Sequence, residues 1–293
     1  MKVAIYSRGV DIDQQQSLQA LLHALDKYAV TIYVYEELLD KFNLQASVGK
    51  EPLIAFNSFS AIHDSIDCLI SLGGDGTVLD AVTLVGDTNI PILGINYGRL
   101  GFLASISKDE LSLMVDALIN RTFVIEKRAL MHLDSNLPIF GTTPFGLNEF
   151  VIHKRDTSPM IKIHTYLNGE FLNSYWADGL IVSTATGSTG YSLSVGGPLV
   201  MPSSDILIIA PMSPHNLNVR PLVVSSSSKL RFEVSSRSQN FLVSIDSRSK
   251  AVDSKMAITV EKAEFVAKIV KIPGDDFLQT LRNKLNWGLD VRN

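Results

Sequence analysis

A buried strand that leads through a glycine turn into a helix is the feature that most constrains this chain. The largely apolar run 66–72 stops abruptly at residues 73–77, which read Gly-Gly-Asp-Gly-Thr, and a helical pattern of apolar residues follows. Glycines let a backbone approach an anion closely, and the free N–H groups and dipole of a helix N-terminus favour negative charge. The turn is therefore a candidate phosphate site. The carboxylate of Asp75 inside it indicates a further task, with a proton, a metal ion or a sugar hydroxyl.

Strand-like and helical segments alternate over residues 1–122. The leucines at 18, 21, 22 and 25 share one helical face, and Ser107 with Glu110 forms a capping box that opens a later helix. This alternation is typical of a parallel sheet, so we expect a Rossmann-like, doubly wound α/β domain. The strand-like runs are residues 3–6, 31–35, 68–72 and 91–95.

From about residue 123 the pattern changes to short strands separated by turns. These strands are predicted at 161–167, 171–175, 180–183, 206–210, 222–224, 230–234, 241–245, 257–260 and 266–272. Asn168-Gly169 between the first two is a strong hairpin signal. We expect a β-rich, sandwich-like domain at 123–272. The tail carries a capped amphipathic helix pattern that we expect to return to the first domain, which then comprises 1–122 and 273–293.

Length and composition indicate an ordinary globular protein. With 293 residues, 46% of them hydrophobic, the chain is long enough for two domains with substantial cores. The formal net charge of −4 gives no reason to expect a nucleic-acid partner. No apolar run approaches the roughly 18–20 residues that span a bilayer, and no signal peptide is visible. We expect a cytoplasmic protein without a membrane partner, in which the single cysteine, Cys68, is buried and inert.

A second strand also ends in a glycine turn. The strand at 91–95 leads into 96–102, which reads Asn-Tyr-Gly-Arg-Leu-Gly-Phe. Ligands of doubly wound sheets lie beyond the carboxyl ends of the strands, so we expect the two turns to face one cleft. Arg99 could pair with a phosphate there. A solvated loop residue is the alternative explanation for Arg99.

Two stretches of the second part carry residues suited to ligand binding. Asn148-Glu149 precedes a strand, and an adjacent amide and carboxylate can hold a ribose diol, although alone such a pair is more often part of a turn or helix cap. The stretch 178–194 follows a strand with small and hydroxylated residues and one ring, Tyr191. This composition suits a polyhydroxylated, aromatic ligand such as a nucleotide.

Several other chemistries are excluded by motif. The sequence has no G-x-x-x-x-G-K-[ST] phosphate loop, no protein-kinase catalytic loop, no Cys/His metal constellation and no G-x-S-x-G elbow. His215 and Arg220 lie in a proline-framed loop. Residue chemistry alone leaves both a catalytic and a structural role open for His215.

Taken in this order, these stretches resemble the NAD kinase family over roughly residues 66–250. The turn at 73–77 is also shared with diacylglycerol, sphingosine and phosphofructokinase-type kinases, whereas the segment 186–191, with the Asn-Glu pair ahead of it, is highly specific. The matching segments are 73–77, 96–103, Asn148-Glu149, 178–191, Pro214-His215 with Arg220-Pro221, and Asp246.

The resemblance implies an enzyme that transfers the terminal phosphate of ATP to the 2′-hydroxyl of the adenosine ribose of NAD, which gives NADP. It implies Asp75 as the base and Mg²⁺ or another divalent cation bound with ATP, with no protein residue assigned as a metal ligand. It also implies a homodimer or homotetramer. Residues implied to bind ATP and NAD are Gly73, Gly74, Gly76, Thr77, Arg99, Asn148, Glu149, Asp178, Thr186, Thr189, Gly190, Tyr191, Ser192 and Ser194. Among them, Asn148 and Glu149 would hold the adenosine side, and Asp178 would approach the nicotinamide end.

The sequence departs from the family pattern at four positions. Ala185 replaces the usual proline, Gly190 the usual alanine, and Arg248 a common glutamine, while Trp176 stands where a basic residue is frequent. Two alternative functions compete with an NAD kinase. One is a lipid kinase that shares the glycine turn, and the other is a non-catalytic dinucleotide sensor.

Overall fold

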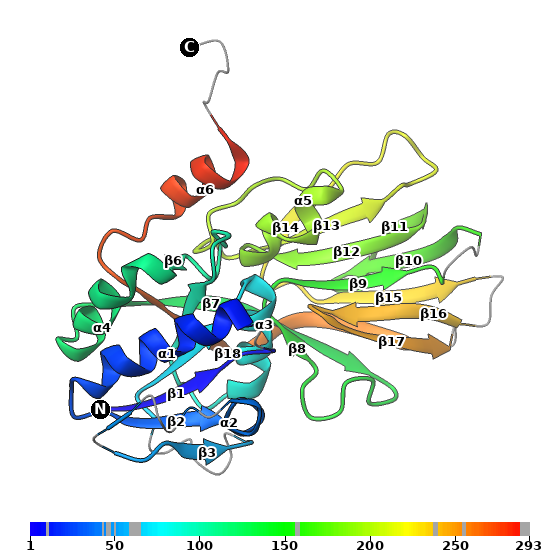
Figure 1. The fold of residues 1–293 in the computed structure, drawn as a ribbon. Helices are drawn as coiled ribbons and strands as arrows, with labels where there is room; N and C mark the ends of the chain where they lie inside the picture. The colour runs from blue at the N-terminus through cyan, green and yellow to red at the C-terminus, as the bar shows by residue number, and fades with distance from the viewer. Residues whose placement is uncertain are drawn as a thin grey trace. The chain divides into compact units, whose positions relative to one another are not determined.

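The computed structural model describes residues 1–9, 12–42, 44, 48–49, 51–58, 66–155, 159–236, 240–253 and 256–287. The chain divides into two compact units (Figure 1). The first comprises Met1–Glu126 and Lys268–Asn293, and the second comprises Lys127–Ala267.

The first unit is built on a parallel sheet. Its strand order is β18-β5-β4-β1-β2-β3, with β6 also paired to β5. The strands are β1 (Lys2–Tyr6), β2 (Thr31–Tyr35), β3 (Ile54–Phe56), β4 (Cys68–Leu72), β5 (Ile92–Asn96), β6 (Ile106–Ser107) and the end of β18 (Ala257–Lys271). The helices are α1 (Ile12–Asp26), α2 (Glu36–Lys41), α3 (Asp75–Val85), the short 3₁₀ helix η4 (Lys108–Glu110), α4 (Leu111–Ile119) and α6 (Phe277–Leu285).

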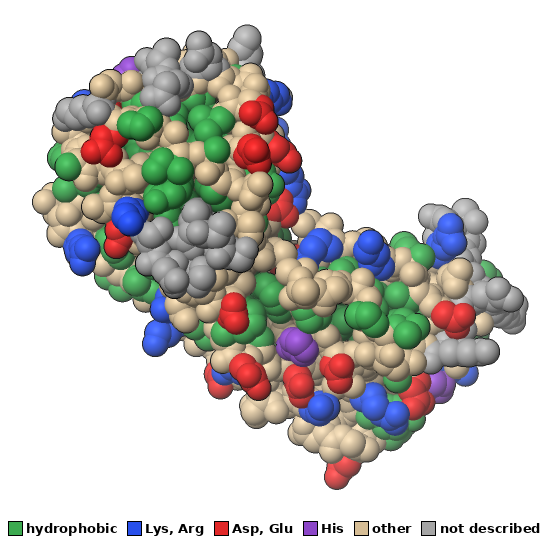
Figure 2. All heavy atoms as spheres, turned by 90° about the horizontal axis from the view of Figure 1, so that it is seen from below, with side chains coloured by type: hydrophobic (Ala, Val, Ile, Leu, Met, Phe, Trp, Pro, Cys, Tyr) green, Lys and Arg blue, Asp and Glu red, His purple; other side chains and the backbone are tan. Residues whose placement is uncertain are grey.

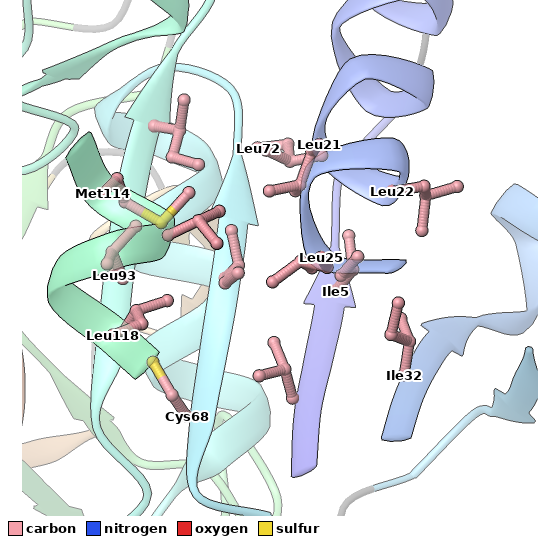
Figure 3. Close-up of a cluster of buried hydrophobic side chains, with 14 of the residues drawn as sticks. Ile5, Leu21, Leu22, Leu25, Ile32, Cys68, Leu72, Leu93, Met114 and Leu118 are labelled. Carbon is pink, nitrogen blue, oxygen red and sulfur yellow. The ribbon is translucent and has the colours of Figure 1, made fainter. Parts of the chain in front are cut away.

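Helices cover both faces of this sheet. The predicted leucines of α1 are fully buried and pack with α4 residues such as Met114 and Leu118 against one face (Figure 3). Leu93 and Ile95 of β5 belong to that cluster, whereas Gly94 between them lies against Val78 of α3. Since successive strand residues point to opposite faces, α3 covers the other side. The prediction of a doubly wound α/β domain is confirmed.

The second unit is a sandwich of two mainly antiparallel sheets. One has the order β14-β13-β12-β9-β16-β17, and the other runs β11-β10-β15-β18 with β7 and β8 attached. Phe150 of the first sheet and Phe232 of the second lie 5.7 Å apart between ring centroids in the shared core. The elements are β7 (Val124–Ser135), β8 (Phe145–Gly146), β9 (Glu149–His153), β10 (Ile161–Leu167), β11 (Glu170–Ala177), β12 (Gly179–Thr184), η5 (Thr186–Thr189), α5 (Tyr191–Ser194), β13 (Ile206–Met212), β14 (Leu222–Ser225), β15 (Leu230–Ser235), β16 (Asn240–Ile245) and β17 (Arg248–Asp253).

Most predicted elements are present, including the Asn168-Gly169 hairpin turn and α6, which packs in the first unit. One correction concerns 257–260 and 266–272, which were predicted as two strands and form the single strand β18. The charged residues at 261, 262 and 264 resemble a turn in the sequence, but they lie within β18 itself. The predicted domain boundaries at 122 and 272 stay predictions, close to where the compact units divide.

Charges on the surface are mixed in sign. On the face drawn in Figure 2, acidic and basic side chains are interspersed. No helix among the described residues is long and apolar enough to cross a membrane.

Candidate active site

The glycine turn joins β4 to α3. Gly74 is the N-cap of α3 and Asp75 is its first residue. Gly73 has a φ of 148°, and a Cβ there would lie 2.3 Å from Oγ1 of Thr77, so this position needs glycine. The cap makes no side-chain hydrogen bond to the helix. The N–H of Thr77 donates to the carbonyl of Gly74 (2.9 Å), whereas the N–H groups of Asp75 and Gly76 belong to the first turn of α3, where an anion can bind.

The carboxylate of Asp75 is held by the second turn. Its Oδ2 accepts the N–H of Phe102 (3.0 Å), and its Oδ1 accepts the N–H groups of Leu103 (3.0 Å) and Ala104 (2.9 Å). A Cβ on Gly101 would lie 2.0 Å from Oδ1, so the loop can approach this closely only with glycine there. The two glycine turns thus meet at the carboxyl ends of β4 and β5, which are adjacent parallel strands.

A buried amide shapes the second turn. The Nδ2 of Asn96 donates to the carbonyls of Ala104 (3.1 Å) and Ile106 (3.0 Å), while its Oδ1 accepts the N–H of Gly98 (3.0 Å). Asn96 is 3% exposed. One side chain therefore closes the loop at both ends and fixes the peptide groups that hold Asp75.

Two arginines lie on loops at this edge. Arg99 is exposed, which is compatible with either of its predicted roles. Arg8 follows β1 and binds both carboxylate oxygens of Asp80 in α3. A Cβ on Gly76 would lie 3.6 Å from Nη1 of Arg8, so a cation stands beside the glycine turn. The sequence interpretation missed Arg8; its position directly after a strand of the same parallel sheet was the available signal.

In the second unit, Asn148 and Glu149 contact the hydroxyl-rich turn. Glu149 is 8% exposed, and its Oε2 accepts the N–H of Tyr191 (3.3 Å). Burial, together with the nearby charge of Asp246, raises the pKa of Glu149 to about 8. A Cβ on Gly187 would lie 2.2 Å from the carbonyl oxygen of Asn148. The structure therefore brings together two stretches that the sequence indicated separately.

Asp246 holds the Asn-Glu pair in place. Its carboxylate accepts the N–H groups of Leu147 (2.8 Å), Asn148 (2.8 Å) and Glu149 (3.2 Å). Burial raises the pKa of Asp246 although these three hydrogen bonds act in the opposite direction. The sequence singled out Asp246 only through the family resemblance, and the three hydrogen bonds give it a physical role.

The turn from Thr184 to Ser194 contains unusually buried hydroxyls. Thr189 donates to the carbonyl of Thr186 (3.2 Å), and Thr186 is 5% exposed. Within the described part of the chain, the buried Ser192 Oγ and Asn148 Oδ1 have no hydrogen-bond partner. Such atoms are costly unless a ligand or water satisfies them. Tyr191 and Ser194 are exposed beside them, and Tyr191 is 43% exposed.

A buried arginine next to this turn was not predicted. Arg128 of β7 is 3% exposed, and its Nη1 lies 3.4 Å from Oγ1 of Thr186. A single arginine within a strand does not indicate in the sequence whether its side chain is buried. Only the alternation of charged and apolar residues around it could have indicated an inward-facing cation.

The predicted residue Asp178 and two positions that depart from the family pattern, Trp176 and Arg248, also lie in the second unit. Asp178 joins β11 to β12 and forms an ion pair with Lys154 (2.7 Å). Trp176 stacks on His215 with 4.4 Å between ring centroids. Arg248 donates to the carbonyl of Thr143 (2.6 Å) and to that of Phe145, so it supports the backbone there.

The comparisons with known proteins agree with these motifs. Residues 19–123 match the ATP-NAD kinase N-terminal domain, and residues 147–272 match the ATP-NAD kinase C-terminal domain. The chain belongs to the NAD kinase family. An NAD kinase of Cytophaga hutchinsonii is 46% identical over the full length of both chains. The predicted family is confirmed, and a lipid kinase is not favoured.

Solved structures of the NAD kinase family share the fold. An NAD kinase from Archaeoglobus fulgidus in complex with ATP has a TM-score of 0.77 and 25% identity, over 98% of this chain and 99% of that one. A yeast NADH kinase complexed with NADH has a TM-score of 0.89 and 22% identity, over 99% of this chain and 89% of that one.

Proposed function

We propose that this chain transfers the terminal phosphate of ATP to the 2′-hydroxyl of the adenosine ribose of NAD, which gives NADP. Membership of the NAD kinase family supports this activity. The observation that carries the proposal is the carboxylate of Asp75, held by three N–H groups within a glycine turn at a helix N-terminus.

Asp75 acts as the base in this proposal. A secondary hydroxyl must give up its proton as the phosphoryl group arrives, and a carboxylate within hydrogen-bond reach can take it. The three N–H groups occupy part of a carboxylate's capacity, which is about four lone pairs. Oδ2 accepts only one of them and keeps room for a hydroxyl. The N–H groups of Gly74 and Gly76 stabilise phosphate charge, Gly73 and Thr77 shape the turn through N–H bonds to the carbonyls of Ile95 and Gly74, and Arg99 adds a cation.

The second unit binds the dinucleotide. Glu149 and Asn148 bind the adenosine ribose, and the unpartnered oxygens of Asn148 and Ser192 find donors on the ligand. Asp178 serves the nicotinamide end. The rest of the NAD surface is formed by Thr186, Thr189, Gly190, Tyr191 and Ser194.

The donor set fits a divalent cation that arrives with the nucleotide. No group of three or more His, Cys, Asp or Glu side chains suited to a metal ion occurs among the described residues. Mg²⁺ commonly binds through substrate phosphates and keeps several waters, so the phosphates of ATP would hold the cation. When bound, the cation would neutralise charge on the transferred phosphate.

Two further expectations belong to this proposal. We propose a homodimer or homotetramer, as the resemblance implies, and light scattering of the full chain tests it, since a monomer would contradict it. We also propose that the enzyme works in the cytoplasm, where both substrates are found.

A competition between acceptors tests the function. The protein is incubated with Mg²⁺ and γ-labelled ATP, and with NAD, NADH or a lipid extract. The expected result is label in NADP and none in lipid. Label in lipid alone supports the lipid kinase, and NAD binding without transfer supports a sensor.

A further inference from the structure

A buried ionic cluster lies directly behind the loop that holds Asp75. Lys271, the last residue of β18, donates to Oδ2 of Asp275 (2.9 Å) and to Oγ of Ser105 (3.1 Å), and Ser105 donates to the same Oδ2 (2.5 Å). The side chains of Lys271 and Asp275 are 10% and 6% exposed. All three residues belong to the first unit.

Ser105 connects this cluster to Asp75 through one peptide. The preceding residue, Ala104, donates its N–H to Asp75 and accepts hydrogen bonds from Asn96 and Gly101 at its carbonyl. The side chain of Ser105 therefore connects the loop, through hydrogen bonds, to the C-terminal segment of the chain. The loop is also held by α6, where Lys284 donates to the carbonyl of Leu100 (2.6 Å) and Phe277 packs on Phe102.

Stability alone is a weak reason for such a cluster. Burying a lysine and an aspartate costs desolvation energy that their attraction only partly offsets, and apolar residues of similar size often stabilise a protein more. A charged cluster does, however, fix one geometry, because each oxygen must lie where its donor is. This property is useful where a peptide must be held to within a fraction of an ångström.

We propose that Ser105, Lys271 and Asp275 form a positioning cluster that fixes the N–H groups of residues 102–104 and thereby orients the carboxylate of Asp75. The cluster acts through the loop and does not touch the reacting atoms. Its catalytic consequence rests on the function proposed above, whereas its effect on the loop does not.

The test compares Ser105→Ala with two controls. Ser105→Ala removes one hydroxyl and leaves the Lys271–Asp275 ion pair, so the fold is retained. Ser105→Thr keeps the hydroxyl, and Ser105 lines a pocket of about 400 Å³. Ser107→Ala removes the capping box two residues further on without touching the cluster.

Two quantities are measured on the full-length chain. Hydrogen exchange of the amides of residues 102–104 reports on the loop, and steady-state kinetics with NAD and Mg²⁺–ATP separates kcat from KM. For Ser105→Ala we expect exchange about tenfold faster and kcat lowered about 10- to 100-fold, with both KM values within about twofold. Ser105→Thr should restore both quantities, and Ser107→Ala should change neither.

The outcomes separate the two proposals. Unchanged exchange in Ser105→Ala, or equal effects in Ser105→Ala and Ser107→Ala, overturns the positioning cluster. A loss of kcat that Ser105→Thr fails to restore also overturns it. If the wild-type chain forms no NADP, the proposed function fails, and the exchange measurement still decides whether the cluster holds the loop.

Discussion

Glu149 is a carboxyl group whose protonation is set by its surroundings. It is buried beside Asp246, and its pKa is raised to about 8, so in the free protein it is largely neutral at pH 7. Hydroxyl donors stabilise the charged form of a carboxyl group and lower its pKa. A ribose hydroxyl that donates to Glu149 therefore favours loss of the proton.

We predict that NAD binding at pH 7 releases a proton from Glu149. Calorimetric titrations in buffers of different ionisation enthalpy measure the number of protons released. The variant Glu149→Gln has no proton to lose at this position, so its apparent binding enthalpy should not depend on the buffer. Proton uptake by the wild-type protein, or equal release by the variant, would show that Glu149 does not accept a ribose hydroxyl.

At the scale of single residues, the sequence indicates which side chains could bind substrate or take a proton. It does not indicate which other residues hold those side chains in place. Asp75 and the Asn-Glu pair stand out by their neighbours in the chain. The groups that fix Glu149 come from far away, with Tyr191 42 residues and Asp246 97 residues distant. Neither the raised pKa of Glu149 nor the burial of Arg128 could be predicted, because both depend on packing between distant strands.

Among the elements, η5 approaches the start of β9 unusually closely. A Cβ on Gly187 would meet the carbonyl oxygen of Asn148 at 2.2 Å and its carbonyl carbon at 2.6 Å, and neither backbone atom can move freely. The Cβ of an alanine at 190 would instead meet a side-chain end, Oε2 of Glu149, at 2.8 Å, and would lie 3.2 Å from the carbonyl oxygen of Gly187. The two glycines are three residues apart and differ in what they face.

Gly187→Ala should therefore be far more damaging than Gly190→Ala. We expect Gly187→Ala to lower the free energy of unfolding by about 1–3 kcal/mol, a typical cost of overpacking. For Gly190→Ala the change should stay within about 0.5 kcal/mol. Denaturant unfolding of both variants measures the difference. Equal losses would mean that η5 does not pack on the backbone of Asn148.

The sequence predicts the elements where the apolar pattern is regular. The strands β1, β2, β4 and β5 and the α1 leucines follow from the apolar pattern, whereas the short strands β3 and β6 were not predicted. β7 and β17 were missed because charged residues interrupt their apolar residues, and Glu261, Lys262 and Glu264 split β18 in the prediction. The register of the paired strands could not be predicted either, because it depends on which strands become neighbours in the sheet.

At the scale of the whole molecule, the first unit is assembled from both ends of the chain. The end of β18 adds a parallel strand beside β5, and α6 supplies the contacts to the second glycine turn. The amphipathic pattern after residue 276 was enough to predict that the C-terminal helix packs in the first unit. It could not predict that this segment supports the loop around Asp75, because Lys271 and Ser105 are 166 residues apart.

The most direct test of the account is NADP formation by Asp75→Asn. The asparagine has the shape of the aspartate but cannot act as a base, and one of its two oxygen acceptors is lost. The control Asp87→Asn changes an exposed aspartate just beyond the other end of α3. NADP formation, NAD affinity by calorimetry and the unfolding midpoint are measured for both variants and the wild-type chain.

We predict that the wild-type chain and Asp87→Asn form NADP at similar rates. Asp75→Asn should be slower by about 10²- to 10⁴-fold, the range that general base catalysis supplies, and should bind NAD within about threefold of wild type. Turnover by a folded Asp75→Asn at a rate near that of the wild-type chain would contradict the account.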